Sequence, residues 1–203
     1  MTISSGTSIE LAFRETFFNL GLFSDSFCEK MDTHQAILTK LDVRQYSPKK
    51  VPSDVKMKVL EAARAAGTGN NQQHLRFILV QNKESIKRLA EDSTSGPWVA
   101  GADFAVVVLT DPKIGFHLID TGRAVQQMQL SAWNNGVISG VYTGIKEEAM
   151  RRDFGFPADI KPTMVVGFGY PIKKIVGKKS RMPIPEIASI DKFGNKFDPK
   201  KLS

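Results

Sequence analysis

Phe104–Thr110 (FAVVVLT) and Thr163–Gly169 (TMVVGFG) are the two continuous apolar runs that decide the fold. Neither run alternates between polar and apolar residues, so each is predicted to be a strand that is buried on both faces of a sheet. A sheet buried on both faces needs helices on both sides.

Shorter strands and amphipathic helices surround these two runs. Further strands are predicted over residues 76–81 (RFILVQ) and 137–142. Ser53 is a suitable N-cap, and Gly67, Gly136 and Gly155 are suitable helix stops. Helices are predicted over residues 32–41, 53–66, 83–91, 118–135 and 146–154. The order of elements lacks strict βαβ regularity and therefore indicates an α+β or mixed α/β domain, followed by an extended tail from Pro171.

The composition limits the class of protein. The chain has 203 residues, which suits one well-cored domain, and a net charge of +7, which favours anionic partners. Its single cysteine, Cys28, allows no internal disulfide and fits a reducing cytosol. No apolar run approaches the roughly 18–20 residues of a membrane helix, and Arg14 and Glu15 interrupt the N-terminal apolar stretch. We therefore expect a cytoplasmic protein that does not engage a membrane.

Residues 1–30 differ in pattern from the rest. Ile9, Phe13, Phe17 and Leu20 recur at helical spacing. A second methionine, Met31, precedes the first regular helix pattern. The expected organisation is a partly helical appendage over residues 1–30 and one domain over residues 31–203.

Several common catalytic devices are missing from the sequence. There is no P-loop and no G-x-S-x-G, and the GTGNN of residues 67–71 lacks the third glycine and the preceding strand of a dinucleotide-binding turn. His34, His74 and His117 are far apart, without a second ligand at metal spacing, so no metal site is expected.

Four polar clusters remain, and each also has an ordinary explanation as a loop. Lys40, Asp42 and Arg44 would share a face if their segment is extended, and two cations there could bind a phosphate. The GTGNNQQH of residues 67–74 offers amide donors and acceptors to a uracil-like ring edge, or is a connector. Residues 139–144 (SGVYTG) would let a flat ligand approach a strand end, or are a turn. Residues 178–183 (KKSRMP) are, taken alone, a basic surface run.

The order and spacing of these clusters are more specific than any one of them. From about Asp32 to Asp191 the chain resembles the FMN-dependent nitroreductase family, whose pattern is R-x-S-x-[RK], then P-S-x-x-N-x-Q-P-W, then K-x-R-x-P. Residues 71–77 (NQQHLRF) are similar to its N-x-Q-P-W-x-F, and residues 179–183 (KSRMP) match the tail element. The resemblance implies a central mixed, mainly antiparallel sheet flanked by helices, in a homodimer with FMN at the interface.

The same resemblance implies a set of cofactor-binding residues. Lys40, Leu41, Asp42, Lys179 and Arg181 would surround the phosphate and ribityl chain. Arg44 would reach the flavin ring, where a cation stabilises the reduced form. Thr68 and Asn71 would contact the flavin from the other subunit, and Gln73 would contact the ring or support that loop. Val141, Tyr142 and Thr143 would lie along one side of the isoalloxazine.

The implied activity is a ping-pong oxidoreductase reaction. NADH or NADPH would deliver a hydride to flavin N5, and a small oxidant such as a nitroaromatic, a quinone or a flavin would then accept it. No catalytic side chain is expected, because the flavin carries the chemistry.

The sequence departs from the family pattern in four places. Asp42 stands where the family has Ser, Lys40 replaces Arg, and Gly67 and His74-Leu75 replace Pro and Pro-Trp. A carboxylate beside a phosphate requires a cationic partner. Few residues separate the helix over 83–91 from the strand at Phe104, so Trp98 or the N-terminal segment is a candidate cover for the substrate.

Other readings stay open from the sequence alone. Within the fold, the chemistry could instead be reductive dehalogenation or oxygen-dependent flavin breakdown, or the protein could be a flavin-binding regulator without turnover. Nucleic-acid binding is not expected, because the basic tail has no aromatic sheet platform.

Overall fold

Four antiparallel strands form the sheet at the centre of the fold. The structure, a computed structural model, describes residues 32–177 and 179–202. The strands in these residues are β1 (Arg76–Val80), β2 (Phe104–Thr110), β3 (Ile138–Tyr142) and β4 (Lys161–Gly169), in the spatial order β1-β2-β4-β3. β2 pairs with both β1 and β4, and its seven residues are all buried. The two apolar runs are strands, as predicted, and the structure places them as the central pair.

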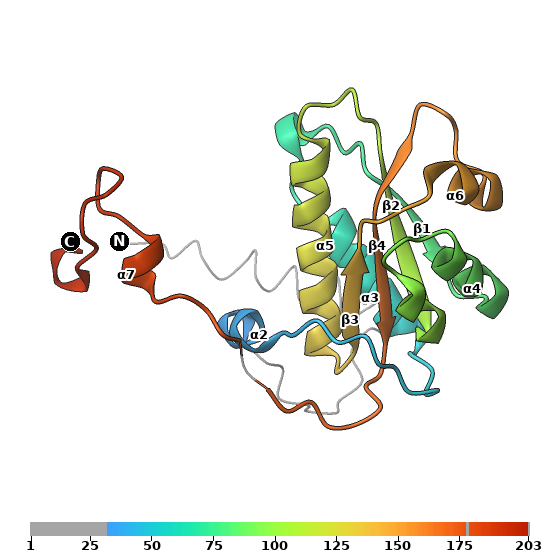
Figure 1. The fold of residues 1–203 in the computed structure, drawn as a ribbon, viewed down its shortest axis with the longest axis horizontal. Helices are drawn as coiled ribbons and strands as arrows, with labels where there is room; N and C mark the ends of the chain where they lie inside the picture. The colour runs from blue at the N-terminus through green and yellow to red at the C-terminus, as the bar shows by residue number, and fades with distance from the viewer. Residues whose placement is uncertain (1–31, 178, 203) are drawn as a thin grey trace, which may run out of the picture. The chain divides into compact units, whose positions relative to one another are not determined.

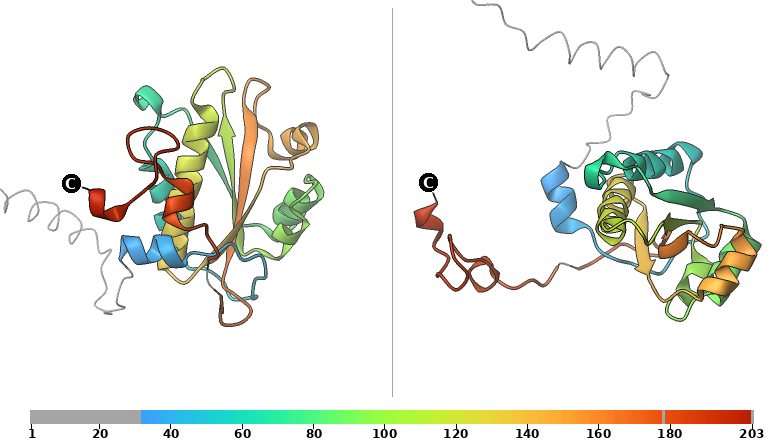
Figure 2. Two further views of the ribbon diagram at one scale, coloured as in Figure 1. Left: turned by 60° about the vertical axis from the view of Figure 1, so that its left-hand side comes forward. Right: turned by 90° about the horizontal axis from the view of Figure 1, so that it is seen from above.

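Helices cover both faces of this sheet, and each face has its own apolar core. Helices α3 (Ser53–Arg64) and α5 (His117–Asn134) lie on one face, while α4 (Lys83–Glu91) and α6 (Glu147–Phe154) lie on the other (Figures 1 and 2). On the α5 face, Phe104 and Phe168 stack with their ring centroids 4.7 Å apart. On the other face, Leu89 and Met150 are fully buried. The expected α+β arrangement is confirmed.

The short helix α2 (Thr33–Thr39) packs beside α5 and delivers the chain to the sheet. Asp32 caps it by accepting a hydrogen bond from the Gln35 amide. After α2, Asp42 forms a single parallel bridge to Ser139 of β3, and Val43 donates to the Ser139 carbonyl. Residues 40–43 are thereby fixed beside the edge strand β3, where Gln129 of α5 contacts Asp42.

Two details of the sequence prediction are wrong. The N-cap of α3 is Pro52, whose φ of −59° and ψ of 151° are extended, and Ser53 is the first helical residue without a side-chain capping bond. The tail is not wholly extended, because Ile184–Ile187 form the four-residue helix α7 and Pro199–Lys201 form the 3₁₀ turn η3. A proline at the first or second position starts each turn, since its fixed φ suits a helix start. The appendage expected over residues 1–30 lies outside the described residues.

Candidate functional site

A polar cavity of about 420 Å³ opens where the segment after α2, the second half of α5 and the tail meet. Five of the residues predicted for the phosphate and ribityl chain meet here from opposite ends of the chain. The lining residues are Lys40, Leu41, Asp42, Gln126, Gln129, Lys179, Ser180 and Arg181. We call this cavity the cationic pocket.

Asp42, the departure that most needed an explanation, has two partners inside the pocket. Its Oδ1 accepts a hydrogen bond of 2.7 Å from Lys40 Nζ and one of 2.8 Å from Gln129 Nε2. Burial alone would raise the pKa of the Asp42 carboxyl, but Lys40 and Gln129 outweigh it and hold that pKa below its ordinary value. Asp42 is therefore ionised and already paired, and the charges of Lys179 and Arg181 remain for an anion.

The cations of the pocket crowd one another. Lys179 Nζ donates to the Ile37 carbonyl at the end of α2 and lies half-buried near Arg181 and Lys40. Loss of solvent contact, followed by repulsion from Arg181 and from Lys40, lowers the pKa of the Lys179 ammonium. A site in which cations repel one another in this way is suited to a phosphate, because the negative charge of the phosphate offsets that repulsion.

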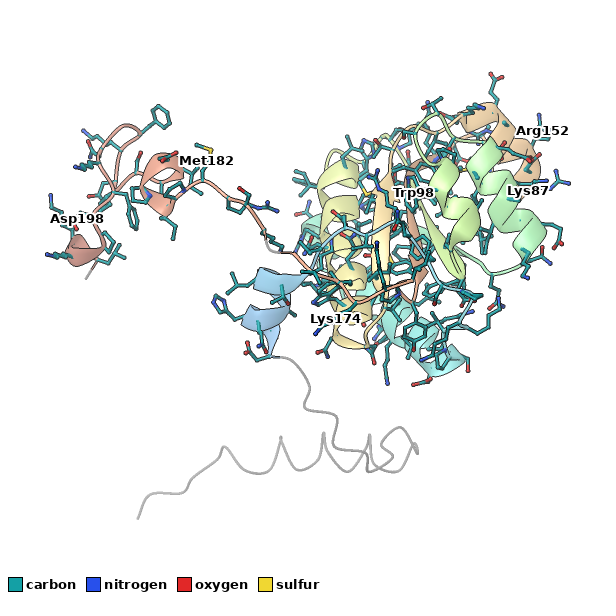
Figure 3. The ribbon with its side chains drawn as sticks, turned by 60° about the horizontal axis from the view of Figure 1, so that its bottom comes forward. Lys87, Trp98, Arg152, Lys174, Met182 and Asp198 are labelled. Carbon is teal, nitrogen blue, oxygen red and sulfur yellow. The ribbon has the colours of Figure 1, made fainter. Side chains whose placement is uncertain are left out.

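Arg44 lies on the other side of the sheet edge. Its guanidinium stands 5.0 Å from the centroid of the Trp98 ring, and its Nη2 donates to the Val141 carbonyl over 3.3 Å. Trp98 lies inside the body beside the strands (Figure 3). The expectation that residues 40, 42 and 44 share one face holds for Lys40 and Asp42 and fails for Arg44. The reason is that Asp42 adjoins Ser139 whereas Arg44 covers Gly140, and successive residues of a strand face opposite sides.

Gly140 makes the contact between Arg44 and Trp98 possible. A Cβ atom at this position would lie 2.8 Å from Arg44 Cγ and 2.9 Å from Trp98 Cη2. Any side chain here would push the two apart. Gly140 is thus needed for the close approach of these two side chains, and the flat ligand expected at this strand end stays a prediction.

The three residues predicted along the isoalloxazine do not share one face. Val141 packs toward the core under α5, whereas Tyr142 is buried on the α4 face and donates to the Leu89 carbonyl over 2.9 Å. Burial raises the pKa of the Tyr142 phenol. Thr143 follows the strand and is exposed. One flat ring can therefore meet this segment through its backbone and Thr143, but not through both other side chains.

Thr68, Asn71 and Gln73 belong to a loop near the other end of α5. Thr68 and Gln73 border a second cavity of about 480 Å³ between α3 and the edge strand β1, lined also by Met57, Leu60 and Phe77. Asn71 is exposed. The two cavities have no lining residue in common. Within one chain, the structure thus brings together the phosphate residues but leaves the 67–73 loop apart from them.

The sequence analysis missed the contribution of α5 to the pocket. Gln126 and Gln129 line it, and Gln129 is only 4% exposed, with a second hydrogen bond of 3.1 Å to Ser139 Oγ. The available signal was the position of Gln129 at helical spacing from Val125 and Ala132, because a buried amide requires partners.

Residues 32–177 and 179–202 hold no group of three or more His, Cys, Asp or Glu side chains placed to bind a metal ion. Of the helices in that range, none has both the length and the apolar character needed to cross a membrane.

Comparisons with known proteins identify relatives of this fold and sequence. The model described as the Nitroreductase family matches residues 37–115 and 97–170. A protein of Methanothermobacter thermautotrophicus, provisionally named NADH dehydrogenase/NAD(P)H nitroreductase, is 31% identical over 156 residues, which cover 72% of this chain and 81% of that protein.

Two solved structures share the fold. The crystal structure of a nitroreductase family protein from Clostridium difficile 630 is 28% identical, has a TM-score of 0.69, and is matched over 80% of this chain and 99% of its own. An FMN-dependent nitroreductase from Clostridium difficile R20291 has a TM-score of 0.71 at 20% identity, over 76% of this chain and 96% of its own.

Proposed function

Because this chain belongs to the nitroreductase family, we propose that it is an FMN-dependent oxidoreductase that passes a hydride from NADH or NADPH to a small oxidant such as a nitroaromatic, a quinone or a flavin. The name of the archaeal relative supports the nicotinamide donor, and the name of the structure from strain R20291 supports FMN. The cationic pocket is the observation on this chain that carries the proposal.

The pocket fits the phosphate of FMN by charge. Lys40, Lys179 and Arg181 supply three cations, and Asp42 offsets one of them. The remaining charge of about two matches a phosphomonoester dianion at neutral pH. Arg181 can donate two parallel hydrogen bonds to such a group, whereas the lysines act as point charges.

Asp42 has a second role in this proposal. A carboxylate would repel the phosphate itself, but it accepts hydrogen bonds from hydroxyl groups. With Lys40 and Gln129 holding it in place, Asp42 would face the ribityl hydroxyls, and the phosphate would lie toward Lys179 and Arg181.

When bound, FMN supplies the hydride chemistry through its flavin ring. The residues of this chain position it. Arg44, held against Trp98 and the Val141 carbonyl, would place a positive charge near the ring. The backbone of residues 141–143 would lie beside the ring. We assign no acid or base, since the flavin carries the reaction.

We further propose a homodimer in which the 67–73 loop of one subunit completes the flavin site of the other. The loop and the cationic pocket lie at different parts of α5 in one chain, which supports two chains per site. Apolar side chains on the start of α5 and in the tail lack cover: Leu118 is 63% exposed, Ile119 62% and Ile187 66%. Exposed apolar surface of this kind marks protein contacts.

Equilibrium binding of FMN and of riboflavin tests the proposal, because the two ligands differ only in the phosphate. Arg181→Ala and Lys179→Ala should each raise the Kd for FMN about tenfold to a hundredfold, from the loss of a charged hydrogen bond of about 1.5–3 kcal/mol. Neither change should alter the Kd for riboflavin. Lys174→Ala is the matched control, since Lys174 is an exposed tail lysine that does not line the pocket. Equal losses for both ligands would contradict the phosphate assignment.

A further inference from the structure

The 67–73 loop has a strained backbone. Asn70, Asn71 and Gln73 have φ values of 52°, 53° and 50°, in the left-handed region that residues other than glycine rarely adopt. Asparagine adopts this region more readily than other non-glycine residues, so the strain falls mainly on Gln73, where it costs about 1–3 kcal/mol and persists only where the surrounding structure enforces it. Something must therefore hold this loop.

One buried carboxylate holds both ends of the strained segment. Asp120, in the first turn of α5, is 1% exposed. Its Oδ2 accepts a hydrogen bond of 2.9 Å from the Gly69 amide and one of 3.0 Å from His74 Nε2. Gly69 immediately precedes the first left-handed residue, and His74 immediately follows the last.

The clamp is charged and closely packed. Burial would raise the pKa of the Asp120 carboxyl, but the Gly69 amide, His74 and Arg123 outweigh it and lower that pKa, so Asp120 is ionised. The His74 side chain is 5% exposed. Phe116 packs against Gly69 so closely that a Cβ there would lie 2.3 Å from its ring. Inside the loop, Thr68 Oγ1 accepts from the Gln73 amide over 3.0 Å.

We propose that Asp120 and His74 are positioning residues that hold residues 70–73 in the conformation that meets the flavin. This inference rests on the proposed function, in which Thr68, Asn71 and Gln73 contact the cofactor. Neither Asp120 nor His74 lines the cationic pocket or the second cavity, so both act through the loop. A loop that is ordered before binding avoids the entropy loss of ordering it on binding, which strengthens affinity.

Asp103 offers a matched control. It too is a buried carboxylate that accepts a backbone hydrogen bond, from Val51 over 3.0 Å, and pairs with cations, Lys50 at 2.9 Å and Lys56 at 3.1 Å. It lies at the start of β2 and contacts neither the loop nor the pocket through these bonds. Asp120→Ala and Asp103→Ala should lower the free energy of unfolding by the same mechanism, the loss of a buried paired charge.

The experiment compares these variants by FMN binding and by hydrogen exchange of the flavin-free protein. For Asp120→Ala we expect amide exchange over residues 69–73 to become at least tenfold faster and the Kd for FMN to rise at least tenfold. Asp103→Ala should lower the stability by a similar amount but leave both the amide exchange over residues 69–73 and the Kd for FMN unchanged. Asp120→Asn keeps an acceptor oxygen for Gly69 and should recover part of the affinity.

The outcomes separate this inference from the function it rests on. Equal effects of Asp120→Ala and Asp103→Ala on the Kd, or faster loop exchange with an unchanged Kd, would overturn the positioning role. If Asp120→Ala does not fold, His74→Ala carries the same comparison, because it leaves the Asp120–Gly69 bond in place. Wild-type protein that binds no FMN contradicts the proposed function itself. Wild-type protein that binds FMN with an affinity indifferent to Asp120 and His74 contradicts this inference alone.

Discussion

Gln129 on α5 donates a 2.8 Å hydrogen bond to the carboxylate of Asp42, which lies 87 residues earlier in the chain. With the 2.7 Å bond from Lys40, this contact compensates the negative charge of Asp42, which would otherwise repel the proposed phosphate. Asp42 holds Lys40 in place and also neutralises part of its positive charge. Stability and cofactor affinity should therefore respond to Asp42 in opposite directions.

Replacing Asp42 by Ser should make the flavin-free protein less stable and make FMN bind more tightly. Lys40, whose side chain is 8% exposed, loses its partner, at a cost of about 1 kcal/mol or more in unfolding free energy. The same change frees the Lys40 ammonium for the phosphate, so the Kd for FMN should fall severalfold. Urea unfolding and fluorescence titration measure the two effects. Weaker FMN binding by D42S would contradict this prediction and would show that the proposed hydrogen bonds from the ribityl hydroxyls to Asp42 outweigh the charge that Lys40 regains.

The affinity for FMN should fall at alkaline pH because of Lys179. Its pKa is lowered in the free protein by burial, by Arg181 and by Lys40, and a bound phosphate would raise it again. Between that lowered pKa and the ordinary value of about 10.4, binding therefore takes up a proton and the Kd rises with pH. Lys179→Arg should flatten this dependence, since a guanidinium stays charged. A Kd for the wild type that does not change up to pH 10 would contradict the role of Lys179.

A mixed dimer tests whether each flavin site uses two chains. One subunit carries Arg181→Ala and the other carries Asn71→Ala with Gln73→Ala. If the loop serves the partner's pocket, one site combines all the substitutions and the other has none, so the dimer keeps one FMN site of wild-type affinity. Separate tags on the two subunits allow the mixed dimer to be purified for titration. Two weakened sites, one carrying Arg181→Ala and the other carrying both loop substitutions, would mean that each chain supplies its own loop.

Gly140→Ala should separate Arg44 from Trp98. The new Cβ would lie within 3.0 Å of both side chains, and overpacking of this kind costs about 1–3 kcal/mol in unfolding free energy. Moving the Arg44 guanidinium away from the flavin ring removes positive charge that stabilises the reduced form. The midpoint potential of bound FMN should therefore shift to more negative values. Gly101→Ala is the control, since the nearest atom to its Cβ would be 3.8 Å away. An unchanged potential in G140A would remove Arg44 from the flavin site.

The sequence predicted the strands and helices well because the spacing of apolar residues along a segment reflects which of its faces are buried. β2 and β4 follow from their unbroken apolar runs, and α4 and α6 follow from their spacing and from Gly155, which has a φ of 70° at the end of α6. Cap positions and the turns of the tail depend on local backbone angles that the apolar pattern does not encode. That is why Ser53 was misplaced by one residue and α7 was missed.

Site residues that lie together in one short motif could be predicted from the sequence. Contacts between residues far apart in the chain could not. Lys179 and Arg181 were predicted from their own motif, and both line the cationic pocket. The pairing of Gln129 with Asp42 and the clamp of Asp120 on His74 link positions 87 and 46 residues apart, which no local pattern reveals. His74 stands where the family pattern has a proline. The structure shows that His74 ties the loop to α5 by a hydrogen bond.

Anaerobic reduction of the FMN-reconstituted wild-type protein tests the central claim most directly. The account predicts a yellow protein whose flavin absorption band bleaches on addition of NADH or NADPH and returns when a quinone or a nitroaromatic compound is added. A protein that takes up no FMN, or one whose bound flavin stays oxidised with both nucleotides, would contradict it.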